Sequence, residues 1–267
     1  NLCGKILFPF YKGEFVINPY YEHYCSLKII PLLCGVTMST KYFITPEGLQ
    51  QENGKEGNRL NPFLKALANF LSYVFHPVFV PLYVIAFILF AEPFLFVGAS
   101  AQEKVLTIGR AFINYTFFPL ISVLLLKGLN LISSIRLRER KDRIIPFIVC
   151  NIWYFWIWYV WRGLPGVPHY LVIFSLSVFL ASSIGLLANI YLKISMHGIA
   201  LGTGTAFLCL LTLDPSSSNI TIYLALAILI AGIVGTSRLL LSEHTPREYY
   251  MGLGVGTLAV LIANVVA

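Results

Sequence analysis

One short stretch of the chain brings together residue types that can handle phosphate. It runs from Ser237 to Glu248 and reads Ser-Arg-Leu-Leu-Leu-Ser-Glu-His-Thr-Pro-Arg-Glu. If the segment is helical, His244 and Glu248 share one face because they are spaced i, i+4. A carboxylate beside an imidazole orients the ring and makes it competent as a nucleophile or base, and Arg238 supplies a planar fork for phosphate oxygens. The alternative is an interfacial loop whose charges lie in water or among lipid headgroups.

A second polar cluster precedes a glycine-rich apolar run. It contains Lys193, Ser195 and His197, and Gly198 follows. Ser195 is expected to cap the helix that starts there, which leaves N–H groups near His197 free to bind an anion. The alternative is a capping serine and a structural histidine beside small residues that let helices pack closely.

Basic residues form a third cluster, between Arg136 and Arg143. Taken alone, this run is ordinary juxtamembrane charge that sets membrane topology. Taken with the other two clusters, it completes the set that phosphoryl chemistry requires. That set is cations to neutralise the oxygens, a nucleophile, and an acid for the leaving group.

The composition indicates that a bilayer surrounds most of the chain. Hydrophobic residues make up 57% and charged residues 12% of the 267 residues, whereas about a quarter of the residues of a soluble domain are charged. The net charge of +7 comes from basic residues beside the ends of apolar runs. This favours lipid headgroups or an anionic substrate over nucleic acid as partners. The five cysteines have no metal-ligand spacing, so the sequence supplies no ligand set for a metal.

The apolar runs predict an all-α fold, a polytopic membrane bundle of about six or seven transmembrane helices, since a crossing needs roughly 20 residues of helix. The expected helices cover about 70–90, 105–133, 144–161, 170–191, 197–213, 219–240 and 249–266. Pro77 and Pro81 interrupt the first helix, so we expect it to be kinked or re-entrant.

Counting these crossings places the three polar clusters relative to the membrane. Two expected helices separate the first cluster from the second, and two more separate the second from the third. An even number of crossings returns the chain to the side it left. All three clusters are therefore expected on the same face of the membrane.

Residues 1–69 differ from the transmembrane part, residues 70–267. They are rich in Tyr, Phe, Pro and Gly and include the polar stretch Gln50–Asn61. We expect an N-terminal extension that is interfacial or partly disordered. Met38 opens a polar stretch typical of a natural N-terminus. Two options for residues 1–37 follow: they lie outside the native product, or they form a weakly folded interfacial segment.

The segment Ser237-Arg238-x5-His244-x3-Glu248 resembles the third signature of the type 2 phosphatidic acid phosphatase superfamily, which is Ser-Arg-x5-His-x3-Asp. The other two clusters precede it in the order that the family's signatures follow. The resemblance covers roughly residues 105–267.

The remaining two signatures are present in altered form. Ser195-Met196-His197 looks like a degenerate Pro-Ser-Gly-His, and Arg136-x6-Arg143 looks like Lys-x6-Arg-Pro. The most serious change is the loss of the glycine before the second histidine, because a backbone N–H often approaches phosphate where glycine lies.

The resemblance implies a metal-independent membrane phosphatase that acts on a lipid phosphate or diphosphate through a phosphohistidine. By that resemblance His244 attacks phosphorus, Glu248 holds its imidazole, and His197 protonates the leaving group. The phosphoryl oxygens would be bound by Arg136, Arg143 and Arg238, with Ser195 and Lys193 as extra donors.

Two alternatives stay open. A headgroup transferase, in which an alcohol replaces water in the second step, requires the same His–acid pair. A non-catalytic membrane binder or transporter on the same scaffold is favoured by Met196 and by Ile144, which stands where the family has proline.

Membrane orientation is not decided by charge, because many basic residues on the motif side are the expected phosphate ligands. By the resemblance we expect an integral membrane protein of a bacterial inner membrane, with the site facing the periplasm. His76, which begins the kinked apolar segment, is within reach of the site. A histidine in that setting more often caps a helix or faces headgroups, and we interpret it so.

Overall fold

The computed structural model describes residues 42–45, 48–51, 61–134, 140–214 and 220–267. The chain divides into two units, residues 1–58 and 59–267. Described residues of the first unit form a hairpin in which β1 (Tyr42–Thr45) pairs antiparallel with β2 (Gly48–Gln51). The second unit, residues 59–267, contains every helix of the described residues.

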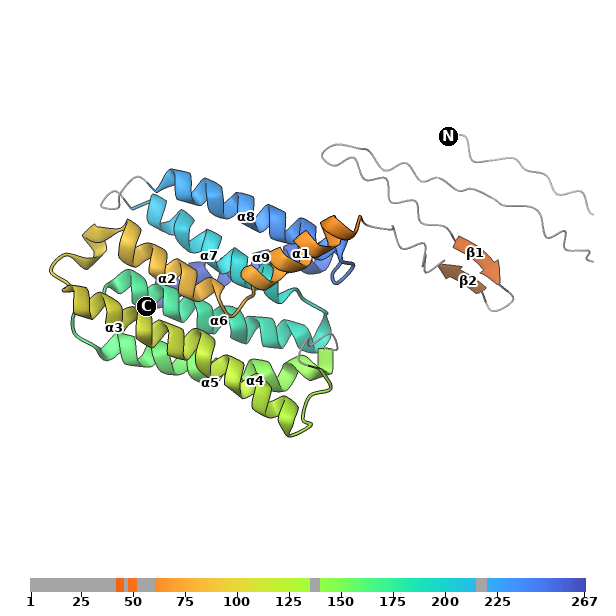
Figure 1. Cartoon of the computed structure of the whole chain (residues 1–267), viewed down its shortest axis with the longest axis horizontal. Coiled ribbons are helices and arrows are strands. Elements are labelled where there is room, and N and C mark those ends of the chain that lie inside the picture. Colours follow the sequence, from red (N-terminus) through yellow and green to blue (C-terminus); the bar gives the residue numbers. More distant parts are fainter. Residues whose placement is uncertain (1–41, 46–47, 52–60, 135–139, 215–219) are drawn as a thin grey trace, which may run out of the picture. The chain divides into compact units, whose positions relative to one another are not determined.

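The second unit is helical throughout its described residues (Figure 1). Its elements are α1 (Pro62–Val74), α2 (Val80–Ala91), the 3-10 turn η1 (Pro93–Phe96), α3 (Ala101–Phe112), the π-helical turn η2 (Ile113–Phe117), α4 (Phe118–Gly128), α5 (Arg140–Gly163), α6 (His169–Tyr191), α7 (Met196–Thr212), α8 (Thr221–Leu240) and α9 (Pro246–Val266). From α3 onward these helices match the expected ranges, with ends shifted by a few residues.

The bundle has the surface and the lengths of a membrane protein. Within the described ranges, five helical segments are long and apolar enough to cross a bilayer, and α2 and α7 are shorter apolar helices. Large apolar side chains lie exposed along them, Ile152, Trp156 and Tyr159 on α5 among others. Exposing so many apolar side chains to water would be unfavourable, whereas the hydrocarbon core of a bilayer accommodates them. The all-α, polytopic membrane fold expected from the sequence is therefore confirmed for the helical unit.

The N-terminal end of the bundle differs from the expectation of one kinked helix over 70–90. The structure has two helices, because α1 ends at Val74 and α2 begins at Val80. Pro77 lacks an N–H and disfavours helical backbone at the residue before it, so the helix cannot run through. The intervening residues make a turn in which the Phe79 N–H donates to the His76 carbonyl at 2.8 Å.

Glycines let α7 and α9 approach backbone to backbone. A Cβ added at Gly202 would lie 2.5 Å from the Leu253 carbonyl oxygen, and one at Gly252 would lie 2.7 Å from that of Ser195. Small residues that allow such close approach are the usual means of packing helices in a bilayer, where apolar side chains gain little by leaving lipid. The contact fixes the N-terminal ends of both helices together, since the Ser195 N–H donates to the Glu248 carbonyl at 3.2 Å.

We predict that Gly256→Ala destabilises the bundle. The new methyl would collide with the backbone of Ile199 and Thr203, and overpacking of this kind costs about 1–3 kcal/mol. Gly254→Ala is the matched control, because a Cβ there meets nothing within 4 Å. Thermal unfolding in detergent, followed by circular dichroism, should give a lower melting temperature for Gly256→Ala alone. Equal melting temperatures would contradict the close contact.

Candidate functional site

Residues from all three polar clusters line one cavity at the end of the bundle where α7 and α9 begin. The cavity has a volume of about 1010 Å³. Four of the expected site residues line it: Arg143, His197, Arg238 and His244. The prediction that the clusters share one face is confirmed for their described residues. Arg136, the remaining arginine of the expected set, lies outside the described residues.

His244 is held by the turn between α8 and α9. Ser242 closes α8 with a φ of 54°, and Pro246 starts α9 at a position where its missing N–H costs nothing. Thr245 caps α9 in a reciprocal box: its hydroxyl accepts from the Glu248 N–H at 3.3 Å, and its own N–H donates to Glu248 Oε2 at 3.4 Å. The capping box thus fixes the orientation of the Glu248 carboxylate, which also contacts His244.

The His244–Glu248 pair has the geometry of an oriented imidazole. His244 Nδ1 lies 2.8 Å from Glu248 Oε2, and the His244 side chain is buried. A carboxylate accepts hydrogen bonds, so the proton of the neutral ring lies on Nδ1 and donates to Glu248. That assignment leaves Nε2 with a free lone pair, which is the atom that a nucleophilic histidine uses.

The surroundings of His244 keep its ring neutral. Burial, and with it the charges of Arg143 and Arg238, lower the pKa of His244 to about 4, against the opposing effect of the hydrogen bond with Glu248. The ring is therefore uncharged at pH 7. A neutral imidazole with a lone pair toward a cavity that also contains arginines is suited to attack an anion that those arginines hold.

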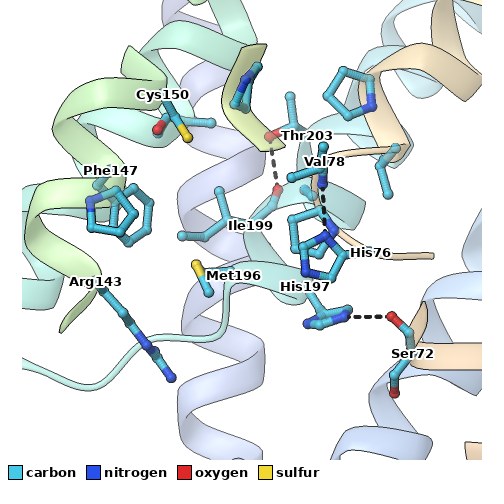
Figure 2. A pocket seen from close by; sticks show the side chains of 18 of the residues that line it. Ser72, His76, Val78, Arg143, Phe147, Cys150, Met196, His197, Ile199 and Thr203 are labelled. Atoms are coloured by element: carbon cyan, nitrogen blue, oxygen red, sulfur yellow. Dashed lines mark hydrogen bonds between the residues drawn. The ribbon is translucent and has the colours of Figure 1, made fainter. Parts of the chain in front are cut away.

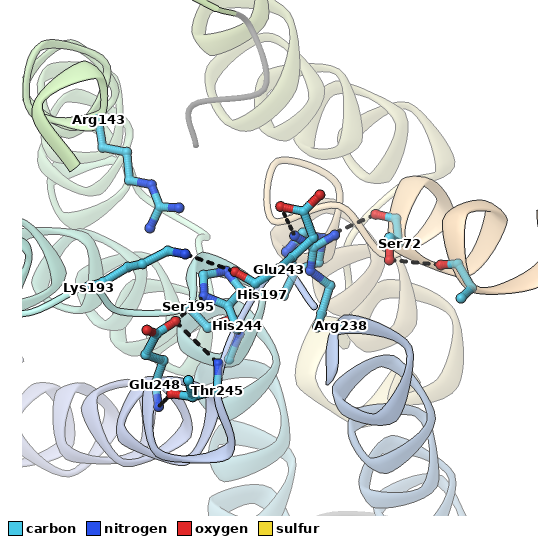
Figure 3. Close-up of polar contacts among 12 residues, drawn as sticks. Ser72, Arg143, Lys193, Ser195, His197, Arg238, Glu243, His244, Thr245 and Glu248 are labelled. Atoms are coloured by element: carbon cyan, nitrogen blue, oxygen red, sulfur yellow. Dashed lines mark hydrogen bonds and ion pairs between the residues drawn. The ribbon is translucent and has the colours of Figure 1, made fainter. Parts of the chain in front are cut away.

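The cationic side chains reach the cavity from different helices (Figure 3). Arg143, buried near the start of α5, donates to the Ile194 carbonyl at 2.9 Å. Arg238, near the end of α8, pairs with Glu243 at 3.9 Å. Both guanidinium groups thus reach the mouth of one cavity, and two planar forks can contact different oxygens of one phosphate.

Lys193 and Ser195 lie beside the cavity but are not among its lining residues. Lys193 Nζ donates to the Glu243 carbonyl at 3.0 Å. Ser195 is fully buried, and its hydroxyl accepts from the Gly198 N–H at 3.3 Å, so it caps α7 as the sequence predicts. The Lys193 contact joins the segment before α7 to the turn before α9, and the Ser195 contact caps α7. The direct phosphate contacts expected of both residues stay predictions.

His197 lies in the first turn of α7 and lines the cavity. Its Nε2 is 3.1 Å from the backbone oxygen of Ser72, at the end of α1 (Figure 2). A carbonyl can only accept, so Nε2 carries the proton and donates it to Ser72. The last carbonyls of a helix lack partners within the helix. The end of α1 therefore orients His197, as Glu248 orients His244.

Sequence reasoning missed the contribution of α1 and of the turn after it. Lys65, Asn69, Ser72 and His76 all line the cavity. The ring of His76 lies 5.7 Å from that of His197, centroid to centroid, at an interplanar angle of 80°. From the sequence, His76 is expected within reach of the site but is interpreted as a residue that caps a helix or faces headgroups. No motif of the sequence pointed to Lys65, Asn69 or Ser72.

Within the described part of the chain, no three His, Cys, Asp or Glu side chains come together as a group that could hold a metal ion. Comparison with protein-family models, curated proteins and solved structures finds no match for this chain.

We predict that His244 stays reactive toward diethyl pyrocarbonate, which acylates neutral imidazole, well below the usual pH range. With a pKa of about 4, roughly nine-tenths of the ring is neutral at pH 5, whereas an imidazole of pKa 6.5 is only about 3% neutral there. Peptide mass spectrometry should give nearly equal acylation rates of His244 at pH 5 and pH 7.5, whereas the rate of a free imidazole standard in the same samples should fall with its neutral fraction. A rate that falls as the standard's does would contradict the neutral, buried ring.

Proposed function

We propose that this protein is a membrane phosphatase of the type 2 phosphatidic acid phosphatase kind, which hydrolyses a lipid phosphate or diphosphate through a phosphohistidine on His244. The observation that carries the proposal is the neutral His244 ring, held by Glu248 at 2.8 Å, in a cavity that Arg143 and Arg238 also line. Nucleophile, positioning carboxylate and anion-binding cations are the parts that phosphoryl transfer to a histidine requires.

In the first step, the lone pair of His244 Nε2 attacks phosphorus while Arg143 and Arg238 hold the phosphoryl oxygens. The bond from phosphorus to the leaving oxygen breaks, and its electron pair stays on that oxygen. Burial, and then the charge of Arg238, lower the pKa of His197 well below its ordinary value, so its protonated form is a strong acid. In that form, with Nε2–H held by Ser72, His197 gives the leaving oxygen its Nδ1 proton. Glu248 stabilises the positive charge that His244 gains on forming the N–P bond.

In the second step, water attacks the phosphohistidine and gives a proton to Nδ1 of His197. The N–P electron pair returns to Nε2 of His244, and inorganic phosphate leaves. Both rings end the cycle as they began it. The water molecule supplies the hydroxyl of the product phosphate, and the proton it loses restores the one that His197 gave to the leaving group.

The remainder of the cavity supports a substrate with an apolar chain. Below the polar end its walls are apolar or aromatic, from α4, α5, α6 and α7. They are formed by Pro119, Leu120, Val123, Pro146, Phe147, Phe174, Val178 and Ile199. A chain placed there leaves water and meets apolar side chains, while the phosphate stays with the cations. By the family resemblance, the polar end faces the periplasm of a bacterial inner membrane.

We predict that His244→Ala abolishes phosphate release by the purified protein from a panel of phosphatidate, a prenyl diphosphate and a lipid A phosphate. Loss of the nucleophile should lower kcat/KM by at least about 100-fold, and Glu248→Gln, which keeps the helix cap but loses the charge, by about 10- to 100-fold. His169→Ala is the control, because His169 is exposed at the start of α6 and is not among the cavity-lining residues.

Radioactive phosphate that stays on the protein after alkaline quenching and is released by acid would identify the phosphohistidine. Equal phosphate release by wild type and His244→Ala would remove His244 from the mechanism. Absence of release by the wild type from every substrate would favour a binder or transporter on this scaffold. Transfer of phosphate to an added alcohol would favour a headgroup transferase.

A further inference from the structure

His76 lies in the turn between α1 and α2, outside the three clusters that define the proposed site. Pro77 follows it and prevents the helix from continuing, so the residue stays at the break. The side chain is partly buried and lines the same cavity as His197 and His244. Figure 2 shows its ring beside that of His197, which belongs to a different helix.

The tautomer of His76 follows from its backbone contact. The Val78 N–H donates to His76 Nδ1 at 3.4 Å. Because Nδ1 accepts, the proton of the neutral ring lies on Nε2. Burial, together with the charge of Arg238, lowers the pKa of His76 to about 4, so the ring is neutral at pH 7. Among the described residues, Nε2–H has no hydrogen-bond partner, and His76 thus presents a neutral donor to the cavity.

His197 differs in this respect, because its Nε2–H already donates to the Ser72 carbonyl. It can serve the leaving group only through Nδ1, and only when protonated. Whenever Nδ1 of His197 carries no proton, His197 has no N–H to donate to the leaving oxygen. The side of the cavity formed by α1, α2 and α7 therefore contains one imidazole whose N–H is engaged and one whose N–H is available.

We propose that His76 donates a hydrogen bond from Nε2–H to the leaving oxygen of the substrate, alongside His197. The inference rests on the proposed function. In-line displacement makes the leaving oxygen depart on the side of phosphorus away from His244, so its donors come from the other elements that line the cavity. His76 keeps its proton throughout. As the P–O bond breaks, the electron pair collects on the leaving oxygen, and the N–H of His76 stabilises that charge until His197 protonates it.

The experiment compares two substrates with the same chain, dodecyl phosphate and S-dodecyl phosphorothioate, in which sulfur replaces the leaving oxygen. Thiols are far more acidic than alcohols, the cysteine thiol having a pKa of about 8.5, so a thiolate leaves with much less help from a donor. We expect His76→Ala to lower kcat/KM for the oxygen substrate by about 10- to 100-fold, as loss of a hydrogen bond to a charged group does, and to change kcat/KM for the sulfur substrate less than threefold.

Three variants control this comparison. His76→Gln places an N–H donor where Nε2 lies and should restore most of the rate on dodecyl phosphate. His197→Ala should also discriminate between the two substrates, because it removes the proposed acid. His169→Ala should change neither rate. Elution from gel filtration in detergent and the melting temperature report whether each variant is folded.

Equal losses of kcat/KM on both substrates by His76→Ala, or no loss on either, would overturn the role of His76. The role of His76 would also be overturned if His197→Ala, and not His76→Ala, lowered kcat/KM selectively for dodecyl phosphate. If His76→Ala does not fold, His76→Leu, which removes the donor and keeps a larger side chain, takes its place: a loss selective for dodecyl phosphate supports the inference, and equal losses or none overturn it. Wild-type protein that releases phosphate from neither substrate would instead reject the proposed function, and this inference with it.

Discussion

The backbone contact between α7 and α9 is the constraint on which the rest of the site depends. Without a Cβ on the facing glycines, the two helices meet closely enough for the Ser195 N–H to reach the Glu248 carbonyl. That bond joins the start of the helix that presents His197 to the start of the helix that presents Glu248. In a bilayer such contacts have no competition from water, so a few of them hold the geometry.

At the end of the bundle where α7 and α9 begin, charged side chains are held in surroundings that normally disfavour charge. Arg143 is buried, yet it donates to a carbonyl, and Arg238 has Glu243 as an ion-pair partner. Burial first, and then the charges of these arginines, lower the pKa of His244, so the ring carries no competing positive charge at neutral pH. The two residue types differ in protonation: the arginines remain charged, whereas the buried imidazole loses its proton and keeps a lone pair.

Much of this arrangement could be predicted from the sequence. Long apolar runs fix the helices, and counting crossings brings Arg143, His197 and His244 to one face. The i, i+4 spacing places Glu248 beside His244, which the 2.8 Å contact confirms. The functions of these residues are not tested by the structure and stay proposals.

What could not be predicted depends on contacts between distant segments. The sequence predicts that Ser195 caps α7, but nothing near it indicates that the residue is fully buried and is not among those that line the cavity. The role of Ser72 rests on a backbone oxygen, which carries no residue signature, and on a hydrogen bond to His197 across more than a hundred positions of sequence. The hairpin before residue 52 was also not expected, because a membrane bundle gave no reason to look for strands.

The ending of α1 at Val74 has a thermodynamic consequence. The acceptor that orients His197 belongs to this short helix, so the docking of α1 and the orientation of the ring are linked equilibria. Linkage is reciprocal: a ligand that stabilises the ring in place also strengthens the docking of α1. Any influence that lifts α1 from the bundle, such as a change in the lipid surface around its exposed Phe63 and Phe70, leaves the imidazole free to rotate. By this linkage, a change in the lipid around α1 would change how firmly the His197 ring is held.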